Sequence, residues 1–448
     1  MEQALFANTL CDALAGADTA ALRDILDEAH PADLARCLTE QEPAAVWKIL
    51  SLLPAERRAE VFGYFAPDLQ VDLARPLSRT QLAQIMFHMS ADERADLFNR
   101  LSPEQRDALL PGLAQAERDD LLRLSAYPEG TAGAVMTSDY ATLPHKLTTR
   151  EAIEVLRREA PDKETIYQAY VIDSQRRLLG TLSLRDLILA PPETRVENIM
   201  VHDVIYARAE DSQAEVAAKI ARYDLLALPI VNGGDKLVGI VTYDDALDVV
   251  EAEATEDFHK GATVGKLDGS VREAALRLLY RKRVFWLVLL VFGNLFSGAG
   301  IAYFEDTITA YVGLVFFLPL LVGSAGNAGS QASTLMVRAL ATGDVMLKDW
   351  GRMLGRELLV AAALGLTMAL AVSGVGVMRG GAELARVVAL AMLFAVMTGG
   401  LIGVSLPFLL SRFNLDPATA SAPLVTTIAD VTGVVIYFSI ASICLPVH

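Results

Sequence analysis

Hydrophobic and polar positions follow three patterns in succession along this chain. Over residues 1–125, short apolar and polar stretches alternate with a period of twelve residues. Residues 126–243 change to short apolar runs separated by turns, which predict alternating strands and helices. From Val284 onward, five apolar segments each exceed the roughly 20 residues that cross a bilayer. The pattern predicts a helical domain, an α/β region and a membrane domain.

The twelve-residue repeat places an apolar residue at one fixed position, followed by a small or capping residue and then by mostly acidic or polar residues. Its apolar members are Leu53, Phe65, Leu77, Met89, Leu101 and Leu113. A small or capping residue, often proline, with an acid in the next turn is typical of a helix start. Short helices at a fixed period bury one face on their neighbours, so an all-α superhelical N domain is predicted.

Two similar segments, 170–188 and 229–247, lie in the α/β region, and each predicts two strands, a polar turn and a helix. Gly180 and Gly239 are 59 residues apart and hold the same place in the two copies. The duplication resembles a tandem pair of cystathionine-β-synthase (CBS) domains. Such pairs resemble regulatory modules that often bind adenine nucleotides between the copies.

The element of a CBS pair that meets ribose is T/S-x-x-D, and both copies contain it. The first copy has Ser183, Arg185 and Asp186, and its counterpart begins at Thr242 and ends at Asp245. The resemblance therefore makes ATP a candidate cofactor at Ser183, Arg185 and Asp186. The alternative is a purely structural dimerisation module.

Residues 244–270 predict an acidic helix that connects the CBS pair to the membrane domain. Its acids up to residue 257 are Asp244, Asp245, Asp248, Glu251, Glu253, Glu256 and Asp257. Clustered carboxylates suit Mg²⁺ and Ca²⁺, which prefer oxygen ligands. Repulsion among bare carboxylates would loosen this region and a bound cation would tighten it. The alternative is that the acids serve only solubility.

Charge is divided unevenly between the two halves of the chain. Residues 1–270 hold 27 Lys and Arg against 46 Asp and Glu, whereas residues 271–448 hold 12 against 9. An acidic surface repels phosphates, which argues against a nucleic acid partner and favours cations.

The membrane domain, residues 271–448, is predicted to contain five helices. Their ranges are 284–304, 308–340, 354–378, 385–411 and 417–447. A basic stretch that includes Arg272 and Arg283 precedes the first helix, and Lys348 and Arg352 lie in the loop after the second. The positive-inside rule places the N-terminal domains and this loop in the cytoplasm, which predicts a multi-pass protein of the cell (inner) membrane.

Asp430 is the only formal charge well inside any of the apolar segments. A carboxylate at bilayer depth costs a few kcal/mol at least, so such residues face a bundle interior or a water-filled path. No basic residue of these segments can pair with it, so we expect its counter-ion to come from solution. The alternative is a protonated structural aspartate. Thr426 and Gly433 beside it, and Asn327 of a small-residue stretch, are candidate pore residues.

The whole chain resembles the MgtE family of Mg²⁺ channels and transporters. The most specific pieces are EAEATEDFHK (251–260), GNAGSQASTLMVRALATGD (326–344) and DPATASAPLVTTIADVTGVVIYF (416–438). The resemblance implies a multidomain homodimer in the lipid bilayer. Its parts are an N domain (1–125), tandem CBS domains (126–243), an acidic plug helix (244–270) and a transmembrane domain (271–448). It also implies a pore at the dimer axis, in which two copies of Asp430 hold a hydrated Mg²⁺.

The family's gating sites lie between its domains and imply a set of regulatory Mg²⁺ ligands here. The matching residues are Glu60, Asp92, Asp96, Asp224, Asp245, Asp248, Glu253, Glu256, Asp257 and Asp416. High cytosolic Mg²⁺ would bridge these acids and close the pore, and low Mg²⁺ would let them separate and open it.

Two other functions fit parts of the sequence. One is a broader divalent cation transporter for ions such as Co²⁺, although few His, Cys or Met residues lie near Asp430. The other is a nucleotide-sensing membrane receptor, which would not need Asp430. An enzyme is not predicted, because the sequence shows no nucleophile–base pair, zinc motif or G-x-x-x-x-G-K-[ST] element.

Overall fold

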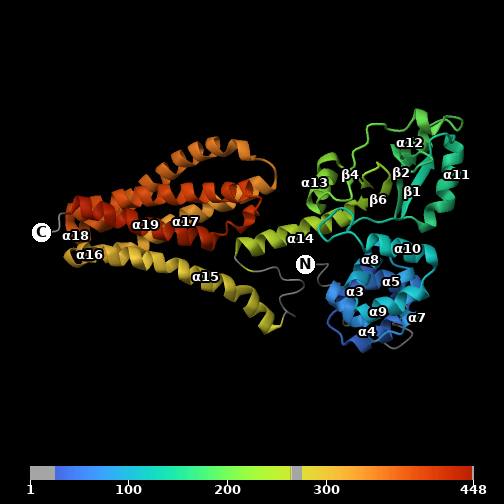
Figure 1. The fold of residues 1–448 in the computed structure, drawn as a ribbon, viewed down its shortest axis with the longest axis horizontal. Helices are drawn as coiled ribbons and strands as arrows, with labels where there is room; N and C mark the ends of the chain where they lie inside the picture. Colours follow the sequence, from blue (N-terminus) through green and yellow to red (C-terminus); the bar gives the residue numbers. More distant parts are fainter. Residues whose placement is uncertain (1–25, 263, 265–274, 446–448) are drawn as a thin grey trace. The chain divides into compact units, whose positions relative to one another are not determined.

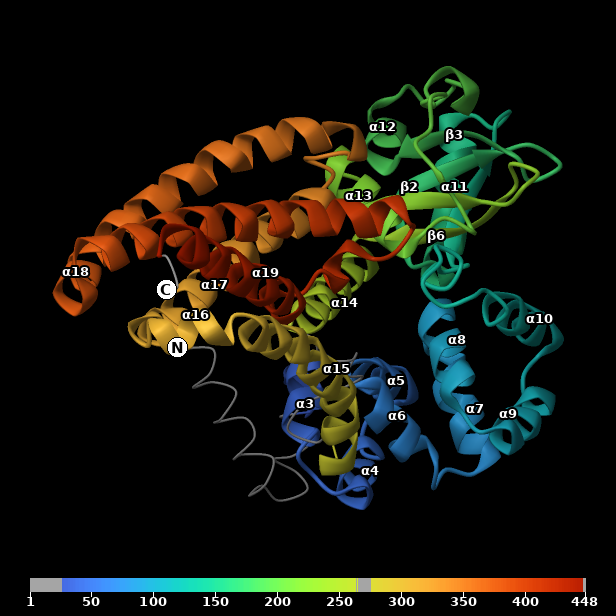
Figure 2. The same ribbon diagram turned by 60° about the vertical axis from the view of Figure 1, so that its left-hand side comes forward.

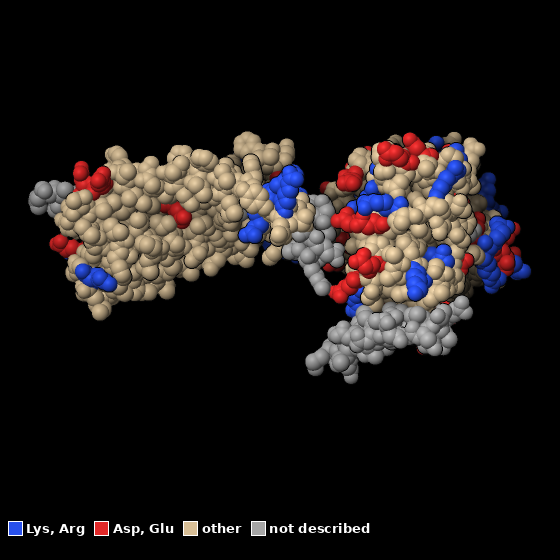
Figure 3. All heavy atoms as spheres, turned by 90° about the horizontal axis from the view of Figure 1, so that it is seen from below, with Lys and Arg blue, Asp and Glu red and all other residues tan. Residues whose placement is uncertain are grey.

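The computed structural model describes residues 26–262, 264 and 275–445 (Figure 1). The chain divides into two compact units, Met1–Glu253 and Ala254–His448. On the face drawn in Figure 3, charged side chains gather over the first unit, whereas the second is mainly uncharged between its ends. Arg272 and the predicted helix end at Val447 lie outside the described residues.

The predicted repeat of short helices is confirmed, because eight described helices begin at intervals of twelve residues. They are α3 (Pro31–Leu38), α4 (Pro43–Leu50), α5 (Ala55–Gly63), α6 (Pro67–Ala74), α7 (Arg79–Phe87), α8 (Ala91–Arg100), α9 (Pro103–Leu109) and α10 (Gln115–Leu124). Helices two apart contact each other, so α3, α5, α7 and α9 form one row and α4, α6, α8 and α10 a second. Capping boxes at Ser78 and Ser102 start α7 and α9.

One polar position of the repeat also holds these short helices together. Arg58 Nε donates to the Leu50 carbonyl at 3.0 Å, and Arg94, Arg106 and Arg118 donate to a carbonyl five residues earlier in the chain. Short helices leave many backbone carbonyls without a hydrogen-bond donor at their ends. The recurring arginine supplies that donor and so removes the free-energy cost of the unsatisfied carbonyl in each repeat.

The α/β region contains two three-stranded sheets of the same topology. The first orders β1 (Tyr140–Pro144), β2 (Thr165–Ile172) and β3 (Leu178–Ser183), and the second orders β4 (Ala207–Arg208), β5 (Ala227–Val231) and β6 (Leu237–Thr242). In each, the first pair of strands is parallel and the second antiparallel. The accompanying helices are α11 (Thr149–Glu159), α12 (Leu184–Leu189), α13 (Gln213–Tyr223) and α14 (Tyr243–Gly261).

The segments before the two copies are exchanged between them. A methyl group at Gly239 of the second copy would lie 2.5 Å from Met136 Sδ, which precedes the first copy. A methyl group at Gly180 of the first copy would lie 2.8 Å from Met200 Sδ, which precedes the second. The paired glycines therefore make room for a methionine from the other repeat, which ties the copies into one body.

The second unit is built from long apolar helices. They are α15 (Leu276–Tyr303), α17 (Gly313–Ala341), α18 (Trp350–Arg412) and α19 (Ala422–Cys444), with the short α16 (Glu305–Ala310), η4 (Leu347–Asp349) and η5 (Pro417–Thr419) between them. Helix α15 begins eight residues before the predicted 284 and includes Arg277 and Arg281–Arg283. Hydropathy marks only the apolar stretch, whereas backbone hydrogen bonds continue through basic residues whose long side chains reach water.

Helix α18 spans 63 residues, about 95 Å at 1.5 Å per residue, which is too long for one crossing. It turns at Gly381, where φ is 77°, and a methyl group at Gly376 would lie 2.8 Å from Ala385 Cα. The two halves therefore pack back on each other, as Figures 1 and 2 show. They correspond to the predicted helices 354–378 and 385–411. Four described helical segments are long and apolar enough to cross a membrane, and five crossings stay a prediction.

Candidate functional site

Asp430 lies on α19 against the small-residue stretch of α17, and glycines let these two helices approach closely. A methyl group at Gly326 would lie 2.8 Å from Thr426 Cγ2 and 3.4 Å from Asp430 Oδ1. One at Gly329 would lie 2.9 Å from Val425 Cγ1. Larger side chains would push α19 away, so the glycines bring the polar groups of both helices together.

A cavity of about 600 Å³ opens beside Asp430, between α15, α17 and α19. Its lining residues are Leu287, Leu290, Val291, Asn294, Asn327, Ser330, Ala422, Pro423, Thr426, Thr427 and Asp430. Ser330 Oγ and Thr426 Oγ1 are hydrogen-bonded at 3.0 Å. Three of the four predicted pore residues thus share one cavity. Gly433 is buried instead against α17, where a methyl group would lie 3.9 Å from Ala325 Cβ.

Asp430 Oδ1 is buried and has no hydrogen-bond partner among the described residues. An unsatisfied carboxylate oxygen in an apolar helix bundle is costly, which favours water or a cation beside it. Across the described residues, no three His, Cys, Asp or Glu side chains form a metal-binding group. One chain therefore presents a single carboxylate, with hydroxyl and amide groups around it.

Asp92 of α8 and Asp245 of α14 lie close enough to repel each other within the first unit. Burial, with the charges of Asp92 and Asp244, raises the pKa of Asp245 to about 8. Burial also raises the pKa of Asp92, and the charge of Asp244 adds a smaller contribution. Thr242 Oγ1 donates a hydrogen bond to Asp245 Oδ2. Without a cation, the carboxyl of Asp245 therefore holds a proton near neutral pH.

Two further acids belong to this cluster, although their spacing in the sequence did not single them out. Burial, with the charge of Asp92, raises the pKa of Glu93 to about 7. Glu164 directly precedes β2, and burial, with the charges of Asp92 and Asp244, raises its pKa to about 7. We define the acidic cluster as Asp92, Glu93, Glu164, Asp244 and Asp245. The fold gathers these acids from the N domain, the first CBS copy and α14.

The other predicted regulatory acids of the first unit lie around this cluster or farther from it. Glu60 and Glu164 line a polar cavity of about 1000 Å³ between α5, α10 and the first CBS copy. Asp96 lies one helical turn after Asp92, and burial, opposed by Arg100 and helped by the charge of Asp92, raises the pKa of its carboxyl to about 6. Asp248 is exposed, and partial burial with the charges of Glu251 and Asp244 raises its pKa. Asp224 is also exposed and ends α13 in a left-handed conformation with φ 51°. Glu253 Oε1 accepts a hydrogen bond of 3.2 Å from Gln213 Nε2.

The second unit places a lysine between two of the predicted Mg²⁺ ligands. Lys260 Nζ lies 2.7 Å from Glu256 Oε1 and 2.5 Å from Asp416 Oδ2. Asp416 Oδ1 also accepts from the Ala418 amide at 2.9 Å, and Asp257 lies on the same stretch of α14, partly buried. The ammonium group neutralises both carboxylates where the sequence predicted a cation. The four-residue spacing of Glu256 and Lys260 is the signal that could have revealed the first contact.

The predicted nucleotide residues form a helix cap. Ser183 Oγ donates to Asp186 Oδ2 at 2.6 Å, and the Asp186 amide donates back to Ser183 Oγ at 3.0 Å. Arg185 and Asp186 are exposed at the start of α12. A cavity of about 280 Å³ elsewhere in the CBS pair is lined by other residues, including His202 and Tyr206.

Three family models match this chain. The model described as a divalent cation transporter matches residues 318–440, the MgtE intracellular N domain matches 29–130, and the CBS domain matches 132–193 and 196–252. The magnesium transporter MgtE of Thermus thermophilus is 41% identical over 99% of both chains. That of Bacillus subtilis is 36% identical over 94% of this chain and 93% of its own.

Two solved structures resemble the part of this chain that precedes the membrane helices. The crystal structure of the cytosolic domain of the Mg²⁺ channel MgtE in complex with ATP is 41% identical, with a TM-score of 0.52, and covers 54% of this chain and 99% of its own. The soluble part of a magnesium transporter is 30% identical, with a TM-score of 0.51, and covers 55% and 98%.

Proposed function

This chain belongs to the MgtE family and transports Mg²⁺, and we propose that two copies form a pore that cytosolic Mg²⁺ closes. The pore would lie at Asp430, in the cell membrane, with the first unit on the cytoplasmic side. Basic residues at the start of α15 and in the loop before α18 support this orientation.

The buried, unpartnered Oδ1 of Asp430 carries the proposal. It lies in a cavity of about 600 Å³ whose polar groups, from Asn294, Asn327, Ser330 and two threonines, present hard oxygen atoms. Mg²⁺ sheds its water reluctantly, so a roomy site with one carboxylate per chain suits a hydrated ion. The lack of sulfur and imidazole in the lining favours Mg²⁺ over softer metals such as Co²⁺.

Two observations support a homodimer. A single chain supplies one carboxylate to the cavity, whereas a divalent ion is neutralised by two. None of the residues of α15 is buried, although this helix is 28 residues long and lines the cavity through Leu287 and Asn294. A second copy would supply the other carboxylate and cover part of this surface.

Closure by Mg²⁺ rests on the two groups of acids outside the membrane helices. The acidic cluster of the first unit keeps carboxyls partly protonated through burial and mutual repulsion. A cation that bound there would relieve the repulsion and hold the N domain, the CBS pair and α14 together. At the other end of α14, Glu256 and Asp416 would exchange Lys260 for Mg²⁺, with Asp257 beside them.

ATP is a second proposed ligand, because the cytosolic domain of a 41% identical relative was solved in complex with ATP. Ser183, Arg185 and Asp186 stand at the start of α12 and would bind the ribose. Titration calorimetry with ATP on the wild type and on Asp186→Asn tests this assignment, since equal affinities would exclude Asp186 from the site.

Patch-clamp recording on membranes that contain the full chain tests the pore. Cytosolic Mg²⁺ is stepped from near zero to about 10 mM, the range of weak, exposed carboxylate sites. We expect openings at low Mg²⁺ that close at high Mg²⁺ and that vanish in Asp430→Asn. The matched control is Asp306→Asn, which removes an exposed acid of α16. Undiminished current in Asp430→Asn would refute the pore, whereas current insensitive to Mg²⁺ would refute only the gating.

A further inference from the structure

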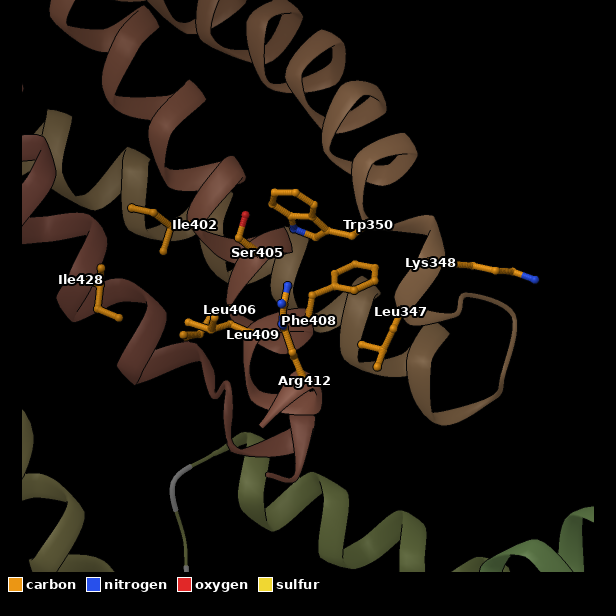
Figure 4. A pocket seen from close by; sticks show the side chains of 10 residues that line it. All are labelled: Leu347, Lys348, Trp350, Ile402, Ser405, Leu406, Phe408, Leu409, Arg412 and Ile428. Atoms are coloured by element: carbon orange, nitrogen blue, oxygen red, sulfur yellow. The ribbon is translucent and has the colours of Figure 1, made fainter. Parts of the chain in front are cut away.

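A second cavity of the membrane domain lies apart from Asp430 and has a different chemical character. It measures about 720 Å³ and is formed by η4, both ends of α18 and one residue of α19. Its walls are almost wholly apolar, with Ile402, Phe408 and Ile428 among them, and Ser405 adds one hydroxyl (Figure 4). This volume lies within the range of cavities that hold small organic ligands.

Two cations stand at the edge of this apolar cavity. Arg412 extends upward beside Leu406 and Phe408, while Lys348 points outward from the rim (Figure 4). Within the described part of the chain, neither Arg412 nor Lys348 forms an ion pair. Both side chains are exposed, so their charges are available to a ligand.

The surroundings of the cavity have the composition of a membrane–water interface. Trp350 lines it with 46% of its surface exposed, and tryptophan is enriched at membrane–water interfaces. Apolar side chains continue outward from it, with Leu409 51% and Phe413 67% exposed. A basic rim over an apolar hollow, at the end of the membrane helices that the proposed function places in the cytoplasm, is the setting in which anionic lipids bind.

The cavity also faces away from the proposed pore. Ile428 and Asp430 are two residues apart on α19, which separates their side chains by about 200° around the helix. If two chains meet at Asp430, as the proposed function requires, Ile428 faces outward to lipid and not toward the second copy. This position favours a lipid over a protein as the occupant.

We propose that this cavity binds an anionic phospholipid, with its phosphate against Arg412, an acyl chain between Ile402, Phe408 and Ile428, and Lys348 adding positive charge at the rim. The headgroup would bind through charge and hydrogen bonds from the guanidinium group. The acyl chain would fill apolar volume that the protein leaves open. The site is distinct from the ion path and from the acidic gating residues.

Native mass spectrometry of the full chain in detergent tests the proposal without any measurement of transport. Delipidated protein receives equal amounts of phosphatidylglycerol and phosphatidylcholine of the same acyl composition. We expect phosphatidylglycerol to be retained at least fivefold more than phosphatidylcholine. The Lys348→Gln/Arg412→Gln double variant should lose this preference, and Arg386→Gln, an exposed arginine near the other end of the α18 hairpin, should keep it.

Two further measurements separate the lipid from other occupants. Inorganic phosphate should not displace bound phosphatidylglycerol, because it lacks the acyl chain, and Ser405→Phe should lower retention by filling the cavity. Equal retention of the two lipids by the wild type, or retention unchanged in the double variant, would overturn the proposal. Loss of the dimeric mass in the double variant would instead assign this face to the second copy and overturn it too.

Discussion

Replacing Asp245 with Asn should stabilise the soluble half in the absence of Mg²⁺. Asp245 is partly buried beside Asp92, and the pKa of its carboxyl is raised to about 8 by burial and by neighbouring acids. A carboxyl with a raised pKa favours folding fully only below its unfolded value of 3.8 and loses that contribution as pH rises toward 8. Asn keeps the size of the side chain and can still accept the hydrogen bond from Thr242.

The size of the effect follows from the two pKa values. At about 1.4 kcal/mol for each pH unit between 3.8 and about 8, full ionisation would cost at most about 5–6 kcal/mol. Asp92 shares the same repulsion, and local relaxation lowers the cost further. We therefore expect Asp245→Asn to gain about 2 kcal/mol at pH 8 and almost nothing at pH 4.5. Saturating Mg²⁺ should stabilise the wild type and shrink the gain at pH 8.

The measurement is urea unfolding of residues 1–261, followed by circular dichroism at pH 4.5 and 8 with and without Mg²⁺. Soluble parts of two relatives that match this half have been solved on their own. The matched control is Asp186→Asn, which removes the equivalent exposed carboxylate of the first CBS copy and should change stability by less than about 0.5 kcal/mol. Equal stability of Asp245→Asn and wild type at pH 8 without Mg²⁺ would show that this cluster stores no repulsion.

Three other outcomes are expected. Lys260→Met should lower the cytosolic Mg²⁺ concentration that half-closes the channel by up to about fivefold, because an exposed ion pair contributes at most about 1 kcal/mol. An unchanged or higher half-closing concentration in patch-clamp recordings would contradict the exchange of Lys260 for Mg²⁺. The half-closing Mg²⁺ concentration should rise about tenfold from pH 8 to pH 6, because Mg²⁺ must displace protons from Glu164 and Asp245, whose pKa values are about 7 and 8. A half-closing concentration that does not change with pH would argue against these two carboxyls as ligands. Gly399→Leu should destabilise the membrane domain by about 1–3 kcal/mol, because the new side chain would overlap the Ala325 carbonyl. Gly351 has open space around it, so Gly351→Leu should leave the stability unchanged, and thermal unfolding in detergent distinguishes the two variants.

Local periodicities in the sequence predicted most of the architecture. A twelve-residue repeat sets the helix starts of the N domain, and the 59-residue duplication sets the two CBS sheets. Such features depend on neighbours within one turn or one hairpin, so spacing alone reveals them. Asp430 stood out for a similar reason, since a lone carboxylate in an apolar segment is visible without coordinates.

Contacts between distant residues could not be predicted in the same way. Lys260 and Asp416 are 156 residues apart, and the sequence assigned Asp416 to a metal without showing its ammonium partner. Glu164 joined Asp92 and Glu93 only when the N domain packed on the first CBS copy.

The order of residues thus indicated the helices, the strands and the apolar membrane segments, because these follow from hydrophobic period, and its motifs carried the resemblance to the family. The packing of distant segments sets which acids repel one another, brings Lys260 to Asp416, and leaves apolar cavities open. Those properties depend on the distances between side chains and on their burial, which cannot be read from the order of the residues alone. A carboxyl such as Asp245 takes its pKa of about 8 from neighbours that reach it only after folding.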